Sequence, residues 1–357
     1  METSLSTLAS LKPSEWRSQF PLLEASDVVY LDTAASAQKP RVVLEAIERF
    51  YREGYANIHR GVYPLSVEAT EKFDATRTAV ARYLNAPSPE QVIFTRGATE
   101  ALNLVAYSWA RTMLQPGDEI VVSLLEHHSN FVPWQMAAEN TGATIRFVAP
   151  DEDGILPAAA FDEAITSRTK LVALTHLSNA LGVVPPVRDV ITKAHAVGAK
   201  VIVDAAQAAA HLRLDVQALD VDFLAFSAHK VYGPTGVGVL FGRREQLEAM
   251  PPFLGGGDMI RAVSVRGTTY AGLPSKFEAG TPNIAGVIGL GAALRFVEEI
   301  GLERMHAYED TLLQDLTREL LTIDGIRVLG GVEGRAAVCS MVIDGVHALD
   351  AAELLGV

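Results

Sequence analysis

The feature that most constrains the fold is an alternation of short apolar runs with amphipathic stretches. Seven runs are rich in β-branched side chains and have the length of strands: "QVIFT", "DEIVVSLL", "TIRFVAP", "KLVALTHL", "AKVIVDA", "DFLAFS" and "VGVLFG". Between most of them lie stretches with helical spacing, such as "VRDVITKAHAVG" and "ATEALNLVAYSWARTML". Alternation of this kind predicts an α/β fold with a mainly parallel sheet covered by helices.

A smaller α/β unit is predicted after this sheet. Residues 284–321 have a helical pattern that breaks near Gly301, and "GIRVLG", "AAVCSMVIDG" and "HALDAAELL" then predict two strands and a helix. We predict an amino-terminal segment (1–35) that packs with the small domain, a large domain (36–285) and a small carboxyl-terminal domain (286–357). The small sheet lacks the strand expected after its last helix, so we expect this domain to be incomplete in the 357 residues.

Charge and cysteine content argue against several classes of protein. The formal net charge is -13 and no block of basic residues is present, which argues against nucleic acid as a partner. A single cysteine excludes a disulfide within the chain and a thiolate zinc site. The chain begins without a signal-type segment and has no apolar run of membrane-spanning length, so we expect a cytoplasmic protein without membrane contact.

Polar residues collect where the predicted strands end. Ligands of open α/β sheets bind outside the carboxyl ends of the strands. The residues that follow these ends are Gly97, Ala98 and Thr99, then His127, Asn179, Asp204 with Gln207, and Ser227, His229 and Lys230. Each alone has a structural explanation, such as a helix cap or a satisfied histidine. A lone lysine is usually solvated, and it resists burial without a partner or a function.

Together these residues match the needs of pyridoxal 5'-phosphate. This cofactor requires a lysine amine for a Schiff base and an acid paired with its pyridine nitrogen. Lys230 would supply the amine, since burial or the neighbouring His229 can lower its pKa. Asp204 would keep the ring nitrogen protonated, and His127 would stack on the ring.

The remaining residues would hold the two ends of the cofactor. The ring hydroxyl would bond to Asn179 and Gln207. The phosphate would lie at the helix that Gly97 begins, where the helix dipole favours an anion. Its ligands would be Thr99, Ser227, His229 and the first amides of that helix, including Ala98.

Other ligand sites fit the sequence less well. There is no Walker-type phosphate loop, and Gly255-Gly256-Gly257 lacks the spacing of a dinucleotide fingerprint and predicts a flexible loop. His127 and His128 are adjacent, so on an extended chain they point to opposite faces and make a poor metal pair. We therefore predict no metal site.

Longer segments carry a resemblance to a known family. They are "VVYLDTAASAQKP", "NIHRGVYPLSVEATEKF", "FTRGATEALNLVA", "LEHHSNFVPWQ", "HLSNALG", "VDAAQAAAH", "FSAHKVYGPTGVGVLFG", "GGGDMI" and "FEAGTPNIAG". In this order they resemble the SUF-type (group II) cysteine desulfurases and selenocysteine lyases, class V members of the fold-type I pyridoxal-phosphate enzymes. The resemblance implies a homodimer that takes sulfur from L-cysteine, or selenium from L-selenocysteine, and leaves L-alanine. It also implies a sulfur-acceptor protein and a role in iron–sulfur cluster assembly.

The same resemblance implies residue roles. The catalytic residues would be Lys230, which also removes the α proton, with Asp204 and His127. Ala34 and Ala35 resemble the backbone that meets the substrate, with His59 nearby and Asn179 near the substrate carboxylate. Gly280 and Thr281 resemble the pair that reaches the phosphate of the partner subunit.

The chain departs from the family at the sulfur-accepting thiol. In the family a nucleophilic cysteine, with arginines close to it, lies beyond the segment that "HALDAAELL" resembles. The sole cysteine here, Cys339, falls in an alternating strand pattern and is predicted to be a small buried residue. We expect a cysteine desulfurase whose nucleophile segment lies outside the 357 residues. The alternatives are another class V enzyme without this cysteine (an epimerase, lyase or aminotransferase) and a catalytically silent scaffold.

Overall fold

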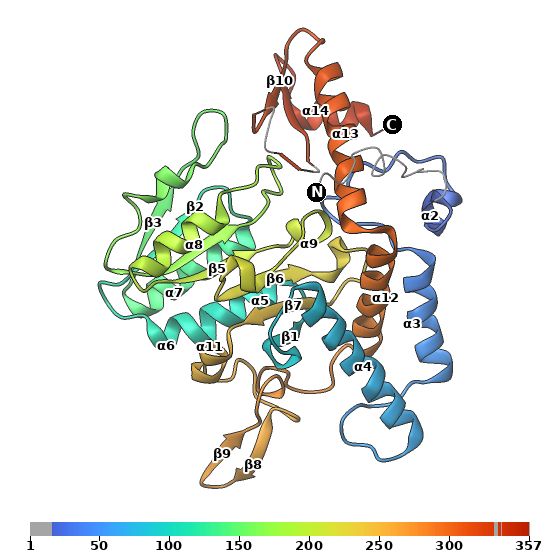
Figure 1. The fold of residues 1–357 in the computed structure, drawn as a ribbon, viewed down its shortest axis with the longest axis vertical. Helices are drawn as coiled ribbons and strands as arrows, with labels where there is room; N and C mark the ends of the chain where they lie inside the picture. Colours follow the sequence, from blue (N-terminus) through green and yellow to red (C-terminus); the bar gives the residue numbers. More distant parts are fainter. Residues whose placement is uncertain (1–15, 332–334, 337, 357) are drawn as a thin grey trace, which may run out of the picture.

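The computed structural model describes residues 16–331, 335–336 and 338–356, and a seven-stranded sheet forms its centre (Figure 1). The strand order is β1-β7-β6-β5-β4-β2-β3. The bounds are Val92–Thr95 (β1), Glu119–Ser123 (β2), Thr144–Val148 (β3), Thr169–Thr175 (β4), Lys200–Asp204 (β5), Phe223–Ser227 (β6) and Gly238–Gly242 (β7). Strands β2 to β6 pair in parallel, and β7 runs antiparallel to both β6 and β1. The seven predicted strands and the mainly parallel sheet are confirmed.

Apolar side chains alternate between the two faces of the sheet, and each face packs against its own helices. In β4, Val172 and Leu174 join one buried cluster, whereas Leu171 and Ala173 join the other. The first face is covered by α4 (Pro64–Tyr83), α8 (Val187–Ala196) and α12 (Ile284–Ile300), and α3 (Arg41–Glu53) packs on α12. The second is covered by α5 (Ala98–Leu104), which continues through a π-helix (Val105–Ala110) into α6 (Arg111–Met113), and by α7 (Val132–Thr141) and α11 (Arg244–Ala249).

The carboxyl-terminal part follows the predicted order of elements. Helix α12 ends at Gly301, whose φ of +90° suits glycine, and α13 (Leu302–Leu320) continues the chain. Strands β10 (Ile326–Leu329) and β11 (Ser340–Ile343) pair antiparallel, and α14 (Ala348–Leu355) follows. None of the described helices is long and apolar enough to cross a membrane. The remaining short helices are α2 (Pro21–Glu24), α9 (Ala208–His211) and α10 (Val216–Leu219).

Cys339 corrects one prediction. It lies one residue before β11 and is partly exposed, so the prediction of a buried strand residue is wrong. The residues around Cys339 alternate as in a strand, but they form an irregular segment that packs on the loop after β4. There the carbonyl of Val338 lies so close to Gly182 that a Cβ at Gly182 would come within 2.6 Å of it.

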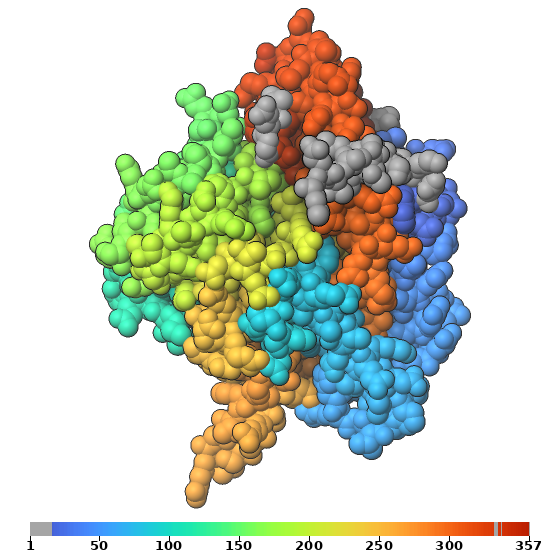
Figure 2. Space-filling view, in the orientation of Figure 1, coloured from blue at the N-terminus to red at the C-terminus, as the bar shows by residue number. Residues whose placement is uncertain are grey.

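A hairpin of β8 (Ile260–Ser264) and β9 (Gly267–Tyr270) projects from the body of the molecule (Figures 1 and 2). Eight of its nine strand residues are exposed. The hairpin is not predicted from the sequence, because a hairpin with both faces in solvent has no apolar alternation that would mark it. It follows the three glycines at 255–257, which belong to no strand or helix.

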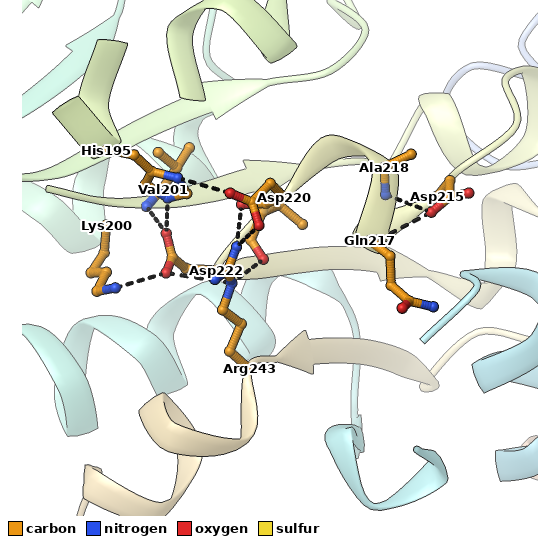
Figure 3. A network of polar contacts seen from close by, with 10 residues as sticks. His195, Lys200, Val201, Asp215, Gln217, Ala218, Asp220, Asp222 and Arg243 are labelled. Carbon is orange, nitrogen blue, oxygen red and sulfur yellow. Dashed lines mark hydrogen bonds and ion pairs between the residues drawn. The ribbon is translucent and has the colours of Figure 1, made fainter. Parts of the chain in front are cut away.

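The edge of the sheet opposite the predicted site is held by a buried carboxylate (Figure 3). Asp222, which is fully buried just before β6, accepts a hydrogen bond from the amide of Val201 at 3.0 Å and lies 2.8 Å from Nε2 of His195. Its other oxygen lies 3.1 Å from Nζ of Lys200, and Nε of Arg243 is 3.7 Å from it. These contacts join α8, β5, β6 and the end of β7. Charged groups thus stabilise this edge of the sheet, and the predicted site lies at the opposite edge.

Candidate active site

The three residues predicted to be catalytic come together at the carboxyl ends of neighbouring strands. Asp204 is the last residue of β5, Lys230 ends a short 3-10 helix (Ala228–Lys230) after β6, and His127 follows β2. They interact electrostatically: Asp204 raises the pKa of both Lys230 and His127, and Lys230 lowers the pKa of His127. The edge of the parallel sheet thus assembles an amine, an acid and an imidazole from distant parts of the chain.

Lys230 is prepared to act as an amine. Burial lowers its pKa from the ordinary value of lysine, and Asp204 only partly opposes this shift. The turn that carries it is tight, because the amides of Val231 and Gly233 both donate to the carbonyl of Ala228 at 2.9 Å. A Cβ at Gly233 would lie 2.9 Å from that carbonyl oxygen, so this position requires glycine. The backbone therefore presents the lysine from a fixed support.

Asp204 is a buried acid that would be stabilised by a cation. It is 4% exposed, and burial raises its pKa above the ordinary value of aspartate. The amide of Ala206, which donates to Oδ1 at 2.9 Å, and the charges of Lys230 and His127 oppose that shift without cancelling it. A protonated ring nitrogen placed here would supply the missing positive charge. In this respect the site fits pyridoxal phosphate.

The predicted phosphate ligands share one cavity. Thr99, Ser227 and His229 line a cavity of about 900 Å³ at the start of α5. Helix α5 begins directly against the sheet, since a Cβ at Gly238 would lie 2.4 Å from the Cα of Gly97. The amide of Ala98 donates to the hydroxyl of Ser227 at 2.8 Å, which leaves the hydroxyl proton of Ser227 to donate to an anion. Ala98 therefore acts on the cavity through Ser227.

The segment 34–39 closes over the lysine turn. The carbonyl of His229 accepts hydrogen bonds from the amide of Ala37 at 3.0 Å and from Nζ of Lys39 at 3.1 Å. Nε2 of Gln207, predicted as a ligand of the ring hydroxyl, donates to the carbonyl of Ala34 at 2.9 Å. Burial lowers the pKa of Lys39. The predicted substrate-binding segment thus lies beside the lysine turn, and Gln207 helps to hold it.

Ala35 and Asn179, both expected near the substrate, lie in turns close to this edge. The amide of Ala35 donates to the carbonyl of Asp32 at 3.1 Å within the turn of segment 34–39. Asn179 is partly exposed in the loop after β4. Their roles as substrate and cofactor ligands stay predictions.

Three predicted residues do not join the cluster within one chain. His59 lies 3.5 Å from Asp74 through its Nε2 and lines a second cavity of about 440 Å³, together with Arg60 and Asp258. Gly280 has a φ of +83°, and Thr281 is exposed beside it. Exposure of this loop is compatible with the predicted contact to a partner subunit, which stays a prediction.

Two residues of this region were missed by the sequence analysis. Lys39 holds the lysine turn, and Glu126, whose carboxyl group is buried, precedes His127. Both fall within the quoted segments "VVYLDTAASAQKP" and "LEHHSNFVPWQ", yet nothing in their spacing marks them. Among the described residues, no group of three or more His, Cys, Asp or Glu is arranged to hold a metal ion.

Comparison with known proteins gives consistent matches. The Aminotransferase class-V family profile matches residues 29–357. The cysteine desulfurase of Cronobacter sakazakii is 48% identical over 344 residues, which cover 95% of this chain and 84% of that protein. The apo cysteine desulfurase of Thermococcus onnurineus is 39% identical with a TM-score of 0.92, and the match covers 98% of this chain and 86% of that one.

Two further solved structures are also similar. The Escherichia coli cysteine desulfurase in its S-sulfonic acid form is 43% identical with a TM-score of 0.90, covering 97% of this chain and 86% of that one. The cystine C–S lyase C-DES, solved with its reaction product cysteine persulfide, is 26% identical with a TM-score of 0.80, covering 91% of this chain and 86% of that one.

Proposed function

This chain belongs to the aminotransferase class-V family, and from that membership and the site geometry we propose that it is a pyridoxal-phosphate-dependent cysteine desulfurase. The observation that carries the proposal is the meeting of Lys230, Asp204 and His127 beside a cavity lined by Thr99 and Ser227. The proposed reaction converts L-cysteine to L-alanine and passes the sulfur to an acceptor protein. Membership of the SUF-type subgroup, a role in iron–sulfur cluster assembly and activity on L-selenocysteine belong to the same proposal.

The chain's own residues have separable tasks in this reaction. When bound, the cofactor supplies an electron sink for negative charge at the α carbon of the substrate. Lys230 would hold the cofactor and, as a free amine favoured by burial, take the α proton. Asp204 would keep a proton on the ring nitrogen, and His127 would cover the ring. Thr99, Ser227 and His229 would hold the phosphate.

Sulfur transfer also needs a thiolate, and Cys339 is the only cysteine in the 357 residues. Its neighbours pack on the loop that carries Asn179: the hydroxyl of Ser340 donates to the carbonyl of Ala180, and Val338 lies against Gly182. Cys339 is therefore held between two packed residues. We propose that it is not the nucleophile, because a reactive thiol needs an exposed, electropositive and mobile setting.

A second candidate function is C–S lyase activity. The likeness to the cystine C–S lyase C-DES and the packed position of Cys339 favour it. An elimination expels the sulfur as the leaving group and needs no enzyme thiol. It yields pyruvate and ammonia in place of alanine, so the two reactions differ in their products.

The test is to incubate the cofactor-loaded chain with L-cysteine and to measure alanine and pyruvate. Pyruvate supports the lyase. Exchange of the α proton of L-cysteine with solvent deuterium, with little alanine, supports a desulfurase that uses a thiolate other than Cys339, and no exchange by a chain that holds the cofactor supports a silent relative. Cys339→Ser is the matched control, and alanine formation that disappears in this variant would make Cys339 the nucleophile. Borohydride reduction followed by mass spectrometry should place the cofactor on Lys230, and an adduct on another lysine would refute that assignment.

A further inference from the structure

Glu126 is a partly exposed residue whose carboxyl group is buried, and the proposed reaction does not use it. Its carboxyl points inward from the turn between β2 and His127. Oε1 accepts a hydrogen bond from the amide of Thr175 at 2.8 Å and lies against the hydroxyl of Ser123, and Oε2 accepts from Nδ2 of Asn130. Each of these three partners is 5% exposed or less. The carboxyl group therefore sits in an enclosed polar pocket at the active edge of the sheet.

These contacts fix the turn that presents His127. Asn130 receives its second bond from the indole Nε1 of Trp134, which donates to Oδ1 at 3.0 Å and is itself fully buried in α7. The end of β4, through Thr175, and the start of α7, through Trp134, thus both hold Glu126 in place. His127 lies between Glu126 and Asn130 in this turn, and its Nδ1 accepts a hydrogen bond from the amide of Ser129 at 3.2 Å.

The pocket accepts a carboxyl group but not an amide. The amides of Thr175 and Asn130 donate to different oxygens of Glu126, and Asn130 cannot turn its amide over without losing Trp134. A carboxyl group satisfies all three partners, because both of its oxygens can accept; when Oε1 is protonated, it can instead donate to the hydroxyl of Ser123. A glutamine would place its NH₂ group against one of the two donors.

The charges around the pocket favour a proton on Glu126. Burial raises the pKa of Glu126, the hydrogen bonds from Ser123, Asn130 and Thr175 oppose that shift, and the negative charge of Asp204 adds to it, which together bring the pKa to about 8. Asp204 faces it from β5, in register with Thr175 of β4, and Lys230 and His127 act on Asp204. His176, the next residue after Thr175, stays uncharged because burial lowers its pKa to about 4. The α7 side contributes Trp134, which has no charge. Two neighbouring carboxyl groups thus share one negative charge.

We propose that Glu126 is a positioning residue: as a neutral carboxylic acid it fixes the turn that presents His127, and it leaves Asp204 as the carrier of negative charge. Its action on the cofactor rests on the proposed function. The neutral state is a property of the chain without cofactor. The two parts can therefore be tested separately.

The first test is infrared spectroscopy of the cofactor-free chain. A carbonyl band of a protonated carboxylic acid should be present at pH 7, fade as the pH rises through about 8, and be missing at pH 7 from Glu126→Gln. Glu139→Gln, which removes an exposed acid of α7, is the matched control and should keep the band. A wild-type chain without the band at pH 7, or a band that survives in Glu126→Gln, overturns the proposal.

The second test is the affinity for pyridoxal phosphate, followed by fluorescence titration. Glu126→Gln should bind the cofactor about 10-fold more weakly, because one hydrogen bond that holds the His127 turn is lost. Glu139→Gln should bind like the wild type. Unchanged affinity in Glu126→Gln overturns the positioning role. A wild-type chain that does not bind the cofactor overturns the proposed function instead, and leaves the infrared result standing.

Discussion

At the scale of single residues, we expect Asp204 to be needed for activity and not for the stability of the fold. Its carboxyl is buried and its pKa is raised, so its negative charge destabilises the fold by more than Lys230 and His127 offset. Asp204→Asn in the cofactor-free chain should therefore unfold at a temperature no lower than the wild type. The cofactor-loaded variant should lose activity by roughly 10²-fold or more, because an amide cannot keep the ring nitrogen protonated.

Thermal unfolding of the cofactor-free chain and product formation by the loaded chain check the two halves. A variant that is strongly destabilised but fully active per bound cofactor would show that Asp204 serves the fold and not the chemistry.

His176 should make the fold sensitive to acid. It is 8% exposed, and burial lowers its pKa from 6.5 to about 4. Between these two values the unfolded chain binds more protons than the folded one, so stability falls as the pH falls through this window. At pH 5 the loss relative to pH 7 should be about 2 kcal/mol from this residue alone. Chemical denaturation at pH 7 and pH 5 should show a correspondingly smaller loss in His176→Phe. An equal loss in both proteins would rule out the buried, neutral state of His176.

The sequence could identify the residues of the site that follow strands, because the carboxyl ends of parallel strands meet at one edge. Lys230, Asp204 and His127 were found in this way, and the structure brings them together. Glu126 and Lys39 were not found, because the contact that ties each to a distant element is made with a residue 49 or 190 positions away in the chain. No local spacing reports such contacts.

At the scale of elements, the sequence predicts what is buried better than what is exposed. The sheet strands other than the edge strand β3 are mainly apolar on both faces and could be recognised as runs. The β8–β9 hairpin could not, since solvent on both faces removes the periodic signal. The segment around Cys339 was misassigned because its alternating residues pack on the loop after β4 instead of extending β11.

The loop that carries Gly280 and Thr281 is anchored by a buried ion pair. Glu278 binds Arg77 of α4 through both oxygens, at 2.7 and 2.8 Å, and also accepts from the amide of Phe94 at 2.7 Å. Removing one partner of a buried pair leaves an uncompensated charge, so Glu278→Ala should lower the free energy of unfolding by about 3–5 kcal/mol. Urea denaturation measures this change.

The same helix provides the control for this prediction. Arg82 pairs with Glu298 on the surface, with the two side chains 65% and 39% exposed. Glu298→Ala should cost less than about 1 kcal/mol, because solvent screens an exposed pair. If both variants lost the same amount, burial would not be what makes the Glu278 pair strong.

At the scale of the whole molecule, the exposed loop at Thr281 predicts assembly. We expect a homodimer in which Thr281 serves the phosphate of the partner's cofactor. Thr281→Ala should then release the cofactor faster while Lys230 still binds it, as gel filtration and absorbance would show. Light scattering measures the oligomeric state directly. A monomer that holds the cofactor tightly would contradict the shared site.

The contact between Lys39 and the carbonyl of His229 also has a consequence for biosynthesis. The two residues are 190 positions apart, so at a translation rate of about 5–20 residues per second Lys39 is made roughly 10–40 s before its partner. During that interval segment 34–39 has no lysine turn to close over. A nascent chain thus cannot form this contact until His229 has left the ribosome, so segment 34–39 reaches its final place only late in synthesis.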